Sequence, residues 1–191
     1  MARPCITSKL SSAINSGGTC QLVGFEEEAV LIPLSYITKS TLAFESGELV
    51  CTVMAKSSPG FKVTIKGDLP FKDTKTDGKM GTYQQMFDND FMFAILENSP
   101  AASKQIKELG NDHYVAVLQA KSYDAAKKNK YIIVGLNRGL YLSAATFAND
   151  SQENFGWRVT MKEVEGLNPM YYFWPSGGES AADSWFAGLI S

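Results

Sequence analysis

The sequence predicts a mainly β fold, an antiparallel β-sandwich or partial barrel with one flanking α-helix. Short runs rich in β-branched and aromatic residues recur between turns that contain Gly, Pro, Asn or Asp. Residues 157–162 alternate between apolar and polar side chains, as in a strand with one buried face. A single segment carries signals for both ends of a helix. The chain has 191 residues, which fits one domain with appendages.

The stretch Tyr131–Gly166 carries the strongest strand pattern. Tyr131–Val134 and Leu140–Phe147 are β-prone runs, and Gly135–Gly139 between them supplies turn chemistry. A polar loop then leads to Trp157–Lys162, which alternates with period two. We interpret this stretch as two hairpins in tandem, which form an antiparallel meander.

Further runs have strand character, and turn-forming residues separate most of them. One run includes Asp88-Asn89-Asp90, which lacks the spacing of a calcium loop and favours a kink, turn or bulge. The remaining strand candidates are Gln21–Phe25, Ala29–Ile32, Leu34–Thr38, Leu42–Phe44, Glu48–Ala55, Phe61–Lys66, Thr82–Leu96 and Tyr114–Leu118. Gly166–Pro169 is expected to end the last strand, and Met170–Trp174 after it is densely apolar.

The predicted helix spans residues 100–109. Ser99 is a good N-cap, and Pro100 occupies the first helical position, where its missing N–H costs nothing. Lys104 and Glu108 have the i,i+4 spacing of an ion pair, and Gly110 is typical of a helix stop.

These elements define three regions: an N-terminal arm (residues 1–24), a β-sandwich domain (25–175) and a C-terminal interaction tail (176–191). The long charged loop 67–81 is either a hairpin tip or a projection that orders against a neighbouring subunit. The bulky apolar side chains of the tail either fold back on their own core or dock on a neighbour, and we favour the neighbour. Deleting Glu179–Ser191 should then impair assembly more than folding. The predicted inter-subunit contacts are Asp68, Phe71, Lys72, Lys75, Lys79, Trp185, Phe186, Leu189 and Ile190.

Reactive chemistry is not indicated. The single histidine, His113, has no nucleophile or metal ligand at a recognised spacing, and no nucleotide-binding or hydrolase motif occurs. Cys5, Cys20 and Cys51 fit no zinc pattern and are expected to be reduced, with a Cys5–Cys20 bridge as the alternative. We therefore expect no enzyme, no cofactor and no metal.

Charge and hydropathy restrict the partners. The formal net charge of −2 gives no electrostatic reason to bind nucleic acid specifically. No apolar run approaches the roughly 20 residues of a membrane span, and the first residues lack the apolar segment of a secretory signal. We expect synthesis in a cytoplasm and no contact with membranes.

The order of these motifs resembles structural tail proteins of phages and prophages of Bacteroidetes-type hosts. The resemblance covers about Tyr83–Tyr172, is loose before it, and does not extend to the aromatic tail after Trp174. The matching motifs consist mostly of turn residues, so their specificity is modest. They are the Gly135–Leu140 hairpin (Gly-Leu-x-x-Gly-Leu), Asn149-Asp150, Glu165–Pro169 (Glu-x-x-x-Pro), and Cys20 with Gly17-Gly18.

The resemblance implies a tail-tube-like fold and a virion structural protein, made in the host bacterial cytoplasm. Such subunits form rings, commonly hexameric, that stack into a conduit for DNA and contact other tail proteins. Loop 67–81 and the N-terminal arm would make ring-to-ring contacts, and a mildly acidic lumen would let DNA slide. The alternatives are a tail terminator, head–tail connector or capsid-associated protein, or a carbohydrate-binding β-sandwich with Tyr171–Trp174 as its platform.

Overall fold

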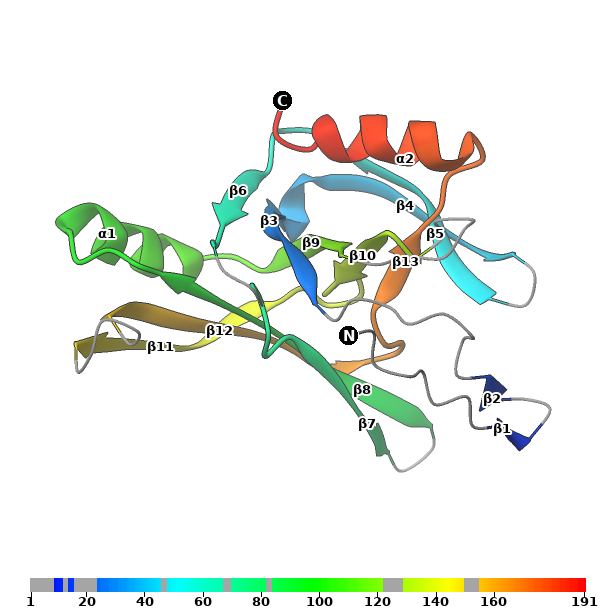
Figure 1. The fold of residues 1–191 in the computed structure, drawn as a ribbon, viewed down its shortest axis with the longest axis horizontal. Coiled ribbons are helices and arrows are strands. Elements are labelled where there is room, and N and C mark those ends of the chain that lie inside the picture. The colour runs from blue at the N-terminus through cyan, green and yellow to red at the C-terminus, as the bar shows by residue number, and fades with distance from the viewer. Residues whose placement is uncertain are drawn as a thin grey trace, which may run out of the picture.

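The computed structural model describes residues 9–11, 14–15, 24–45, 48–66, 70–81, 84–121, 129–149 and 155–191. A seven-stranded sheet packs against a four-stranded sheet, and two helices lie outside them (Figure 1). The predicted fold class, a mainly β sandwich with a flanking helix, is confirmed. Two very short strands near the N-terminus pair only with each other.

In chain order the elements are β1 (Lys9–Ser11), β2 (Ile14–Asn15), β3 (Phe25–Pro33), the 3-10 helix η1 (Leu34–Tyr36), β4 (Ile37–Glu45), β5 (Glu48–Lys56), β6 (Phe61–Thr64), β7 (Lys75–Met80), β8 (Gln85–Ile95), α1 (Pro100–Leu109), β9 (Tyr114–Ala120), β10 (Tyr131–Val134), β11 (Tyr141–Asn149), β12 (Phe155–Gly166), β13 (Tyr171–Phe173) and α2 (Gly178–Ala187).

The seven-stranded sheet has the order β4-β5-β13-β10-β9-β3-β6 and is antiparallel except for the parallel pair β13–β5. Its central strands are apolar on both sides because both faces are covered. In β9, Ala116 and Leu118 face the four-stranded sheet, whereas Val115 and Val117 belong to the cluster beneath α2. All four of these side chains are fully buried.

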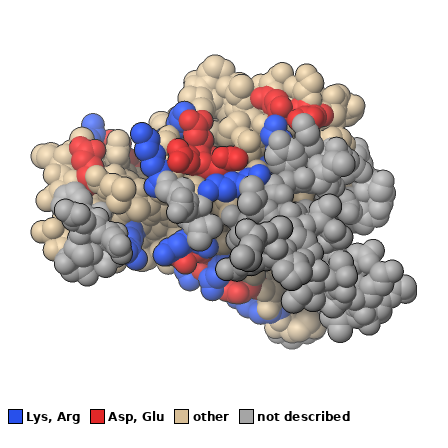
Figure 2. All heavy atoms as spheres, in the orientation of Figure 1, with Lys and Arg blue, Asp and Glu red and all other residues tan. Residues whose placement is uncertain are grey.

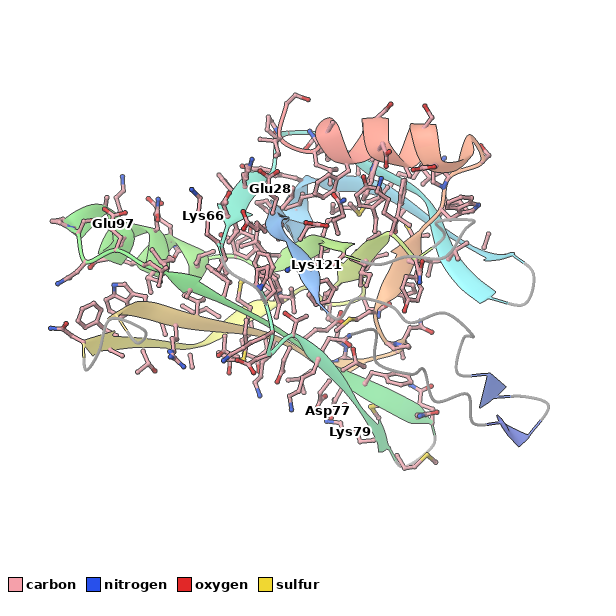
Figure 3. All side chains as sticks on the ribbon, viewed as in Figure 1. Glu28, Lys66, Asp77, Lys79, Glu97 and Lys121 are labelled. Atoms are coloured by element: carbon pink, nitrogen blue, oxygen red, sulfur yellow. The ribbon has the colours of Figure 1, made fainter. Side chains whose placement is uncertain are left out.

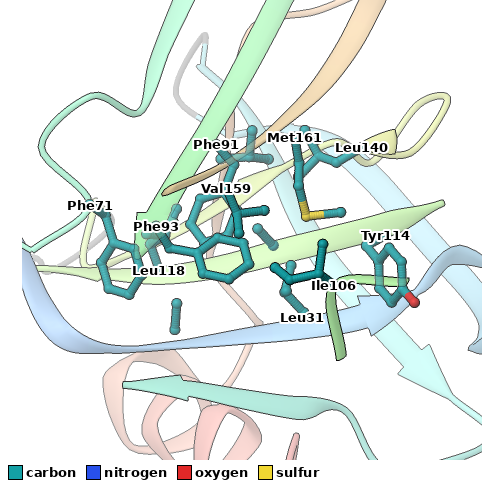
Figure 4. Packing of buried hydrophobic residues seen from close by; sticks show 13 residues of the cluster. Leu31, Phe71, Phe91, Phe93, Ile106, Tyr114, Leu118, Leu140, Val159 and Met161 are labelled. Atoms are coloured by element: carbon teal, nitrogen blue, oxygen red, sulfur yellow. The ribbon is translucent and has the colours of Figure 1, made fainter. Parts of the chain in front are cut away.

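The four-stranded sheet has the order β11-β12-β8-β7 and is antiparallel throughout. Within the described part of the chain, only one of its faces is covered. Phe91, Phe93, Val159 and Met161 point toward the seven-stranded sheet and form the centre of the core (Figure 4). The alternate residues point to the other side, where the structure places no described element (Figure 1).

The predicted tandem hairpins are half right. Strands β11 and β12 form the second hairpin as expected. The first does not form, because β10 already pairs with β9 on one side and β13 on the other. The chain therefore crosses from one sheet to the other at Gly135–Gly139, and both of these glycines have positive φ angles, +85° and +80°. A Cβ on Gly139 would lie 2.6 Å from the Cβ of His113, so the crossover requires glycine there.

Helix α1 forms as the sequence predicts. The Ser99 hydroxyl accepts the Ala102 N–H at 3.1 Å, and Pro100 is the first helical residue. Lys104 and Glu108 form their ion pair at 3.6 Å. Ala102 and Ile106 are buried, so one face of the helix packs on the sandwich.

Two predictions about irregular segments are wrong. Part of loop 67–81 is regular, since residues 75–80 form β7 and pair with β8 along their whole length. The cross-strand pairing supplies the stability that its Gly- and Lys-rich sequence lacks. The kink predicted at Asp88-Asn89-Asp90 is absent from β8. The irregularity lies opposite, in β12 between Glu163 and Gly166, where Glu165 has φ +58°.

Candidate assembly surfaces

Both edges of the four-stranded sheet are unpaired among the described residues: β7 pairs only with β8, and β11 only with β12. The Gly81 N–H donates to the Gln84 carbonyl at 2.8 Å. Because antiparallel residues alternate between facing the partner strand and facing away, the backbone groups of Thr76, Gly78 and Met80 point outward. An unpaired strand of this kind is a template for another strand.

The uncovered face of this sheet carries a ladder of ion pairs. Lys75 lies 2.6 Å from Asp77, Lys79 lies 3.0 Å from Asp88, and Lys162 lies 3.6 Å from Asp90. Asp77 and Lys79 project from the outer side of β7 (Figure 3). Acidic and basic side chains also lie next to one another on the face of the molecule shown in Figure 2. The ladder is thus nearly balanced in charge.

Asp88 has a second role in this ladder. Its Oδ1 accepts the backbone N–H of Glu165 at 2.9 Å, within the irregular part of β12. This hydrogen bond, followed by the Lys79 ammonium, lowers the pKa of the Asp88 carboxyl. The carboxylate therefore fixes the β12 bulge to β8.

A buried carboxylate joins the two sheets. Glu163 is 1% exposed, and its Oε1 accepts the backbone N–H groups of Asn137 at 3.0 Å and Arg138 at 2.6 Å, within the crossover turn. Its Oε2 accepts the Asn89 amide at 2.7 Å. Glu163 is not among the residues predicted from the sequence, although it continues the inward-facing series of Trp157, Val159 and Met161 by two residues. A carboxylate at a position expected to be buried requires hydrogen-bond partners, so the place of Glu163 in this series was the signal that could have predicted the site.

The seven-stranded sheet also has an open edge, at β6. Among the described residues β6 pairs only with β3, and beside it lies a groove of about 740 Å³ bounded by the end of β8 and by α1. Phe61 on β6 and Leu96 after β8 are 54% and 63% exposed at its rim. A large apolar side chain is exposed on each side of an unpaired strand edge.

The C-terminal tail contains helix α2 and folds back on its own sheet. The Trp185 ring stacks on Phe173 with centroids 3.6 Å apart, and its Nε1–H donates to the Met54 carbonyl at 3.0 Å. Phe186 stacks on Tyr131 at 4.8 Å. Leu189 is 2% exposed. The tail therefore completes a core in this chain, and its deletion is expected to damage folding, contrary to the expectation from the sequence.

An ion pair holds the same helix from below. The Lys130 ammonium is 2.6 Å from Asp183 and 3.8 Å from Glu179, and the Tyr131 hydroxyl donates to Asp183 at 2.8 Å. Ile190, just beyond the helix, is 38% exposed. Of the four predicted contact residues in the tail, only Ile190 is left substantially open to solvent.

The contacts predicted in loop 67–81 are separated in the structure. Phe71 is 3% exposed and stacks on Phe91 in the core at 5.5 Å, so it faces its own sandwich. Lys72 is exposed, and Lys75 and Lys79 belong to the ladder on β7. Asp68 lies outside the described residues.

His113 and the cysteines are the side chains with the greatest potential for chemistry. His113 is exposed, and its ring lies 6.2 Å from that of Tyr141. Cys51 is a free, buried thiol whose pKa burial raises to about 11, while Cys5 and Cys20 lie outside the described residues. Within the described part of the chain, no three His, Cys, Asp or Glu side chains are grouped as metal ligands. No helix there is long and apolar enough to cross a membrane.

Comparisons of the chain with protein-family profiles, curated proteins and solved structures found no match.

Proposed function

We propose that this protein is a structural subunit that assembles with copies of itself into rings, as in the tail tube of a bacteriophage. The observation that carries the proposal is the four-stranded sheet, which combines two unpaired edges with one uncovered polar face. The resemblance in sequence to phage tail proteins indicates the virion as the setting. Other tail proteins and passing DNA would be the partners.

The strand directions support closure into a ring. The sheet has an even number of antiparallel strands, so β7 and β11 run in opposite directions. When copies are related by rotation about an axis, β7 of one copy meets β11 of the next in antiparallel orientation. Each copy then extends the neighbour's sheet without reversing a strand, and rotation closes the row.

The uncovered face would line the lumen of such a barrel. Its cations, among them Lys162, are matched by nearby carboxylates such as Asp90. DNA phosphates would meet few unpaired cations there and would slide without being held. This pairing of charges replaces the mildly acidic lumen expected from the composition.

The test is to purify the protein, concentrate it, and examine it by sizing and negative-stain microscopy. Rings or stacked tubes are expected. A folded protein that stays monomeric at every concentration would overturn the proposal. A single ring that never stacks would instead indicate a tail terminator or connector, which is the second candidate function.

A pair of variants at one residue tests the predicted edge directly. Gly78→Pro removes an outward N–H of β7, whereas Gly78→Ala adds a comparable Cβ and keeps that donor. That Cβ would lie 3.4 Å from the Phe87 ring, and both variants share this contact. Gly78→Pro should abolish ring formation, and Gly78→Ala should retain it. Equal assembly of the two would exclude β7 as the ring edge.

The aromatic residues considered as a carbohydrate-binding platform, Tyr171–Trp174, do not share one exposed face. Tyr171 and Phe173 are each 2% exposed in the core beneath α2, whereas Tyr172, between them, is 41% exposed. Alternation along β13 directs the rings to opposite faces, so they do not form one exposed surface.

A further inference from the structure

Strand β6 presents a defined row of free backbone groups. The Ile65 N–H donates to the Glu27 carbonyl on β3 at 2.9 Å. By the alternation of an antiparallel ladder, the N–H and C=O groups of Lys62, Thr64 and Lys66 point away from β3 and toward the open side.

The C-terminal tail already uses the first position of this row. The Gly60 N–H, which is in phase with those of Lys62 and Thr64, donates to the Leu189 carbonyl at 2.7 Å. A backbone carbonyl from another segment therefore satisfies this edge at one end. The positions that follow have no described backbone partner.

The two faces of β6 differ in chemistry. Phe61, Val63 and Ile65 line the groove, and Ile95 and Leu96 border it from the side of β8. A strand added beside β6 would place every second side chain in this apolar groove. Its remaining side chains would lie beside the opposite face of β6.

On that opposite face β6 carries basic side chains, and the carboxylate of Glu28 on the neighbouring β3 lies directly opposite Thr64. The face carries Lys62, Thr64 and Lys66, all of them exposed. Lys62 is paired with Glu28. Lys66, labelled in Figure 3, follows the end of β6 and forms no ion pair with any described residue. The carboxylates that border the groove, Glu97 among them, lie on the side of β8 and α1 and would repel acidic side chains from the apolar face.

We propose that β6 and its groove bind an extended peptide segment of a partner protein as an added β-strand, with apolar side chains alternating with acidic ones. Backbone hydrogen bonds to residues 62, 64 and 66 supply affinity, and the groove and lysines select the sequence. This site lies on the seven-stranded sheet. It is independent of the β7 and β11 edges that would close a ring.

The test uses two capped seven-residue peptides as probes, one alternating Glu with Val and one alternating Lys with Val. Binding is followed by isothermal titration calorimetry. The Glu peptide should bind saturably with a Kd below about 1 mM, at least about tenfold tighter than the Lys peptide. No saturable binding of the Glu peptide, or equal binding of the two, would overturn the proposal.

Matched variants locate the site. Thr64→Pro removes an outward N–H without touching the ladder to β3, and Thr64→Ala keeps it. Leu96→Asp places a charge at the rim of the groove, while Leu167→Asp does the same at a leucine that is 55% exposed elsewhere. Peptide binding should be lost in Thr64→Pro and Leu96→Asp and kept in both controls. Circular dichroism verifies that each variant is folded.

The remaining outcomes identify another occupant. If Thr64→Pro changes the oligomeric state and no peptide binds, a second copy of this chain occupies the groove and the proposal fails. If peptide binding survives Thr64→Pro, strand addition is not the mode of binding. Ring formation is measured in a separate experiment, with Gly78→Ala and Gly78→Pro. Either proposal can therefore fail while the other stands.

Discussion

The two sheets of this sandwich differ in how much of each is enclosed. The seven-stranded sheet is covered on both faces, by the four-stranded sheet and α1 on one side and by α2 on the other. As far as the described residues go, the four-stranded sheet buries one face and leaves the other face and two edges open. Burial of apolar area dominates folding stability, so most of that stability should reside around the enclosed sheet. The open sheet is then free to contribute its backbone and charges to association.

The largest expected effect lies where the two sheets meet. Glu163→Leu should lower the free energy of unfolding by about 3–5 kcal/mol, since the crossover N–H groups of Asn137 and Arg138 and the Asn89 amide lose their shared buried acceptor. Urea denaturation measures the change. A loss below about 1 kcal/mol would show that the crossover holds without this carboxylate.

Glu163→Gln provides the matched control. The amide oxygen can still accept the two crossover N–H groups, but its nitrogen would meet the Asn89 donor. Its loss of stability should therefore fall between those of the wild type and Glu163→Leu.

The next largest effect concerns the contribution of α2 to stability, since this helix covers one face of the seven-stranded sheet. Trp185→Ala should cost about 2–4 kcal/mol, because the stack on Phe173 and the hydrogen bond to Met54 both disappear. Trp185→Phe keeps a ring and should cost about 1 kcal/mol. Thermal unfolding at fixed concentration measures both. A normal melting temperature with failed assembly would instead return α2 to the role of an inter-subunit contact.

Local signals in the sequence predicted much of this fold. Alternation identified β12, and the capping residues identified α1, because both are set by neighbours close in the chain. Helix α2 was also readable. Ala182, Trp185, Phe186 and Leu189 have the i, i+3, i+4, i+7 spacing of one helix face, but the position of this segment at the end of the chain favoured a docking tail.

The crossover shows what local signals cannot supply. A turn between two β-prone runs is compatible with a hairpin or with a change of sheet. The choice depends on whether β10 has a free edge, and its partners β9 and β13 come from distant parts of the sequence. The candidate edges have the same origin. A strand is an edge only because no other strand pairs beside it, which no residue on β7 or β6 encodes alone.

A third prediction uses the reactivity of the Cys51 thiol to test how well the seven-stranded sheet is enclosed. Burial raises the pKa of Cys51 from 9.0 to about 11, so at pH 8 its thiolate fraction should be about 100-fold below that of an ordinary cysteine. Alkylation of Cys51, followed by mass spectrometry of its peptide, should be slower in the folded protein by at least that factor. Urea should restore ordinary reactivity. Rapid alkylation of the native protein would mean that this part of the sheet opens readily.

The raised pKa of Cys51 also makes the free energy of unfolding depend on pH. Between pH 9 and 11 the unfolded chain releases the Cys51 proton and the folded chain keeps it. The unfolded state therefore binds fewer protons, and the free energy of unfolding should fall as pH rises through this interval. A Cys51→Ala variant should show a shallower fall.

The smallest effect belongs to the open sheet. Asp88→Asn should lower the free energy of unfolding by only about 0.5–1 kcal/mol, because the bond to the Glu165 N–H and the Lys79 pair lie near solvent. The folded pKa of Asp88 is lowered, so its contribution is present above the ordinary carboxyl pKa and disappears as pH falls through the folded value. Asp77→Asn, which removes only an exposed pair with Lys75, should leave stability unchanged. If Asp88→Asn costs as much as Glu163→Leu, the open sheet contributes to folding as strongly as the enclosed one.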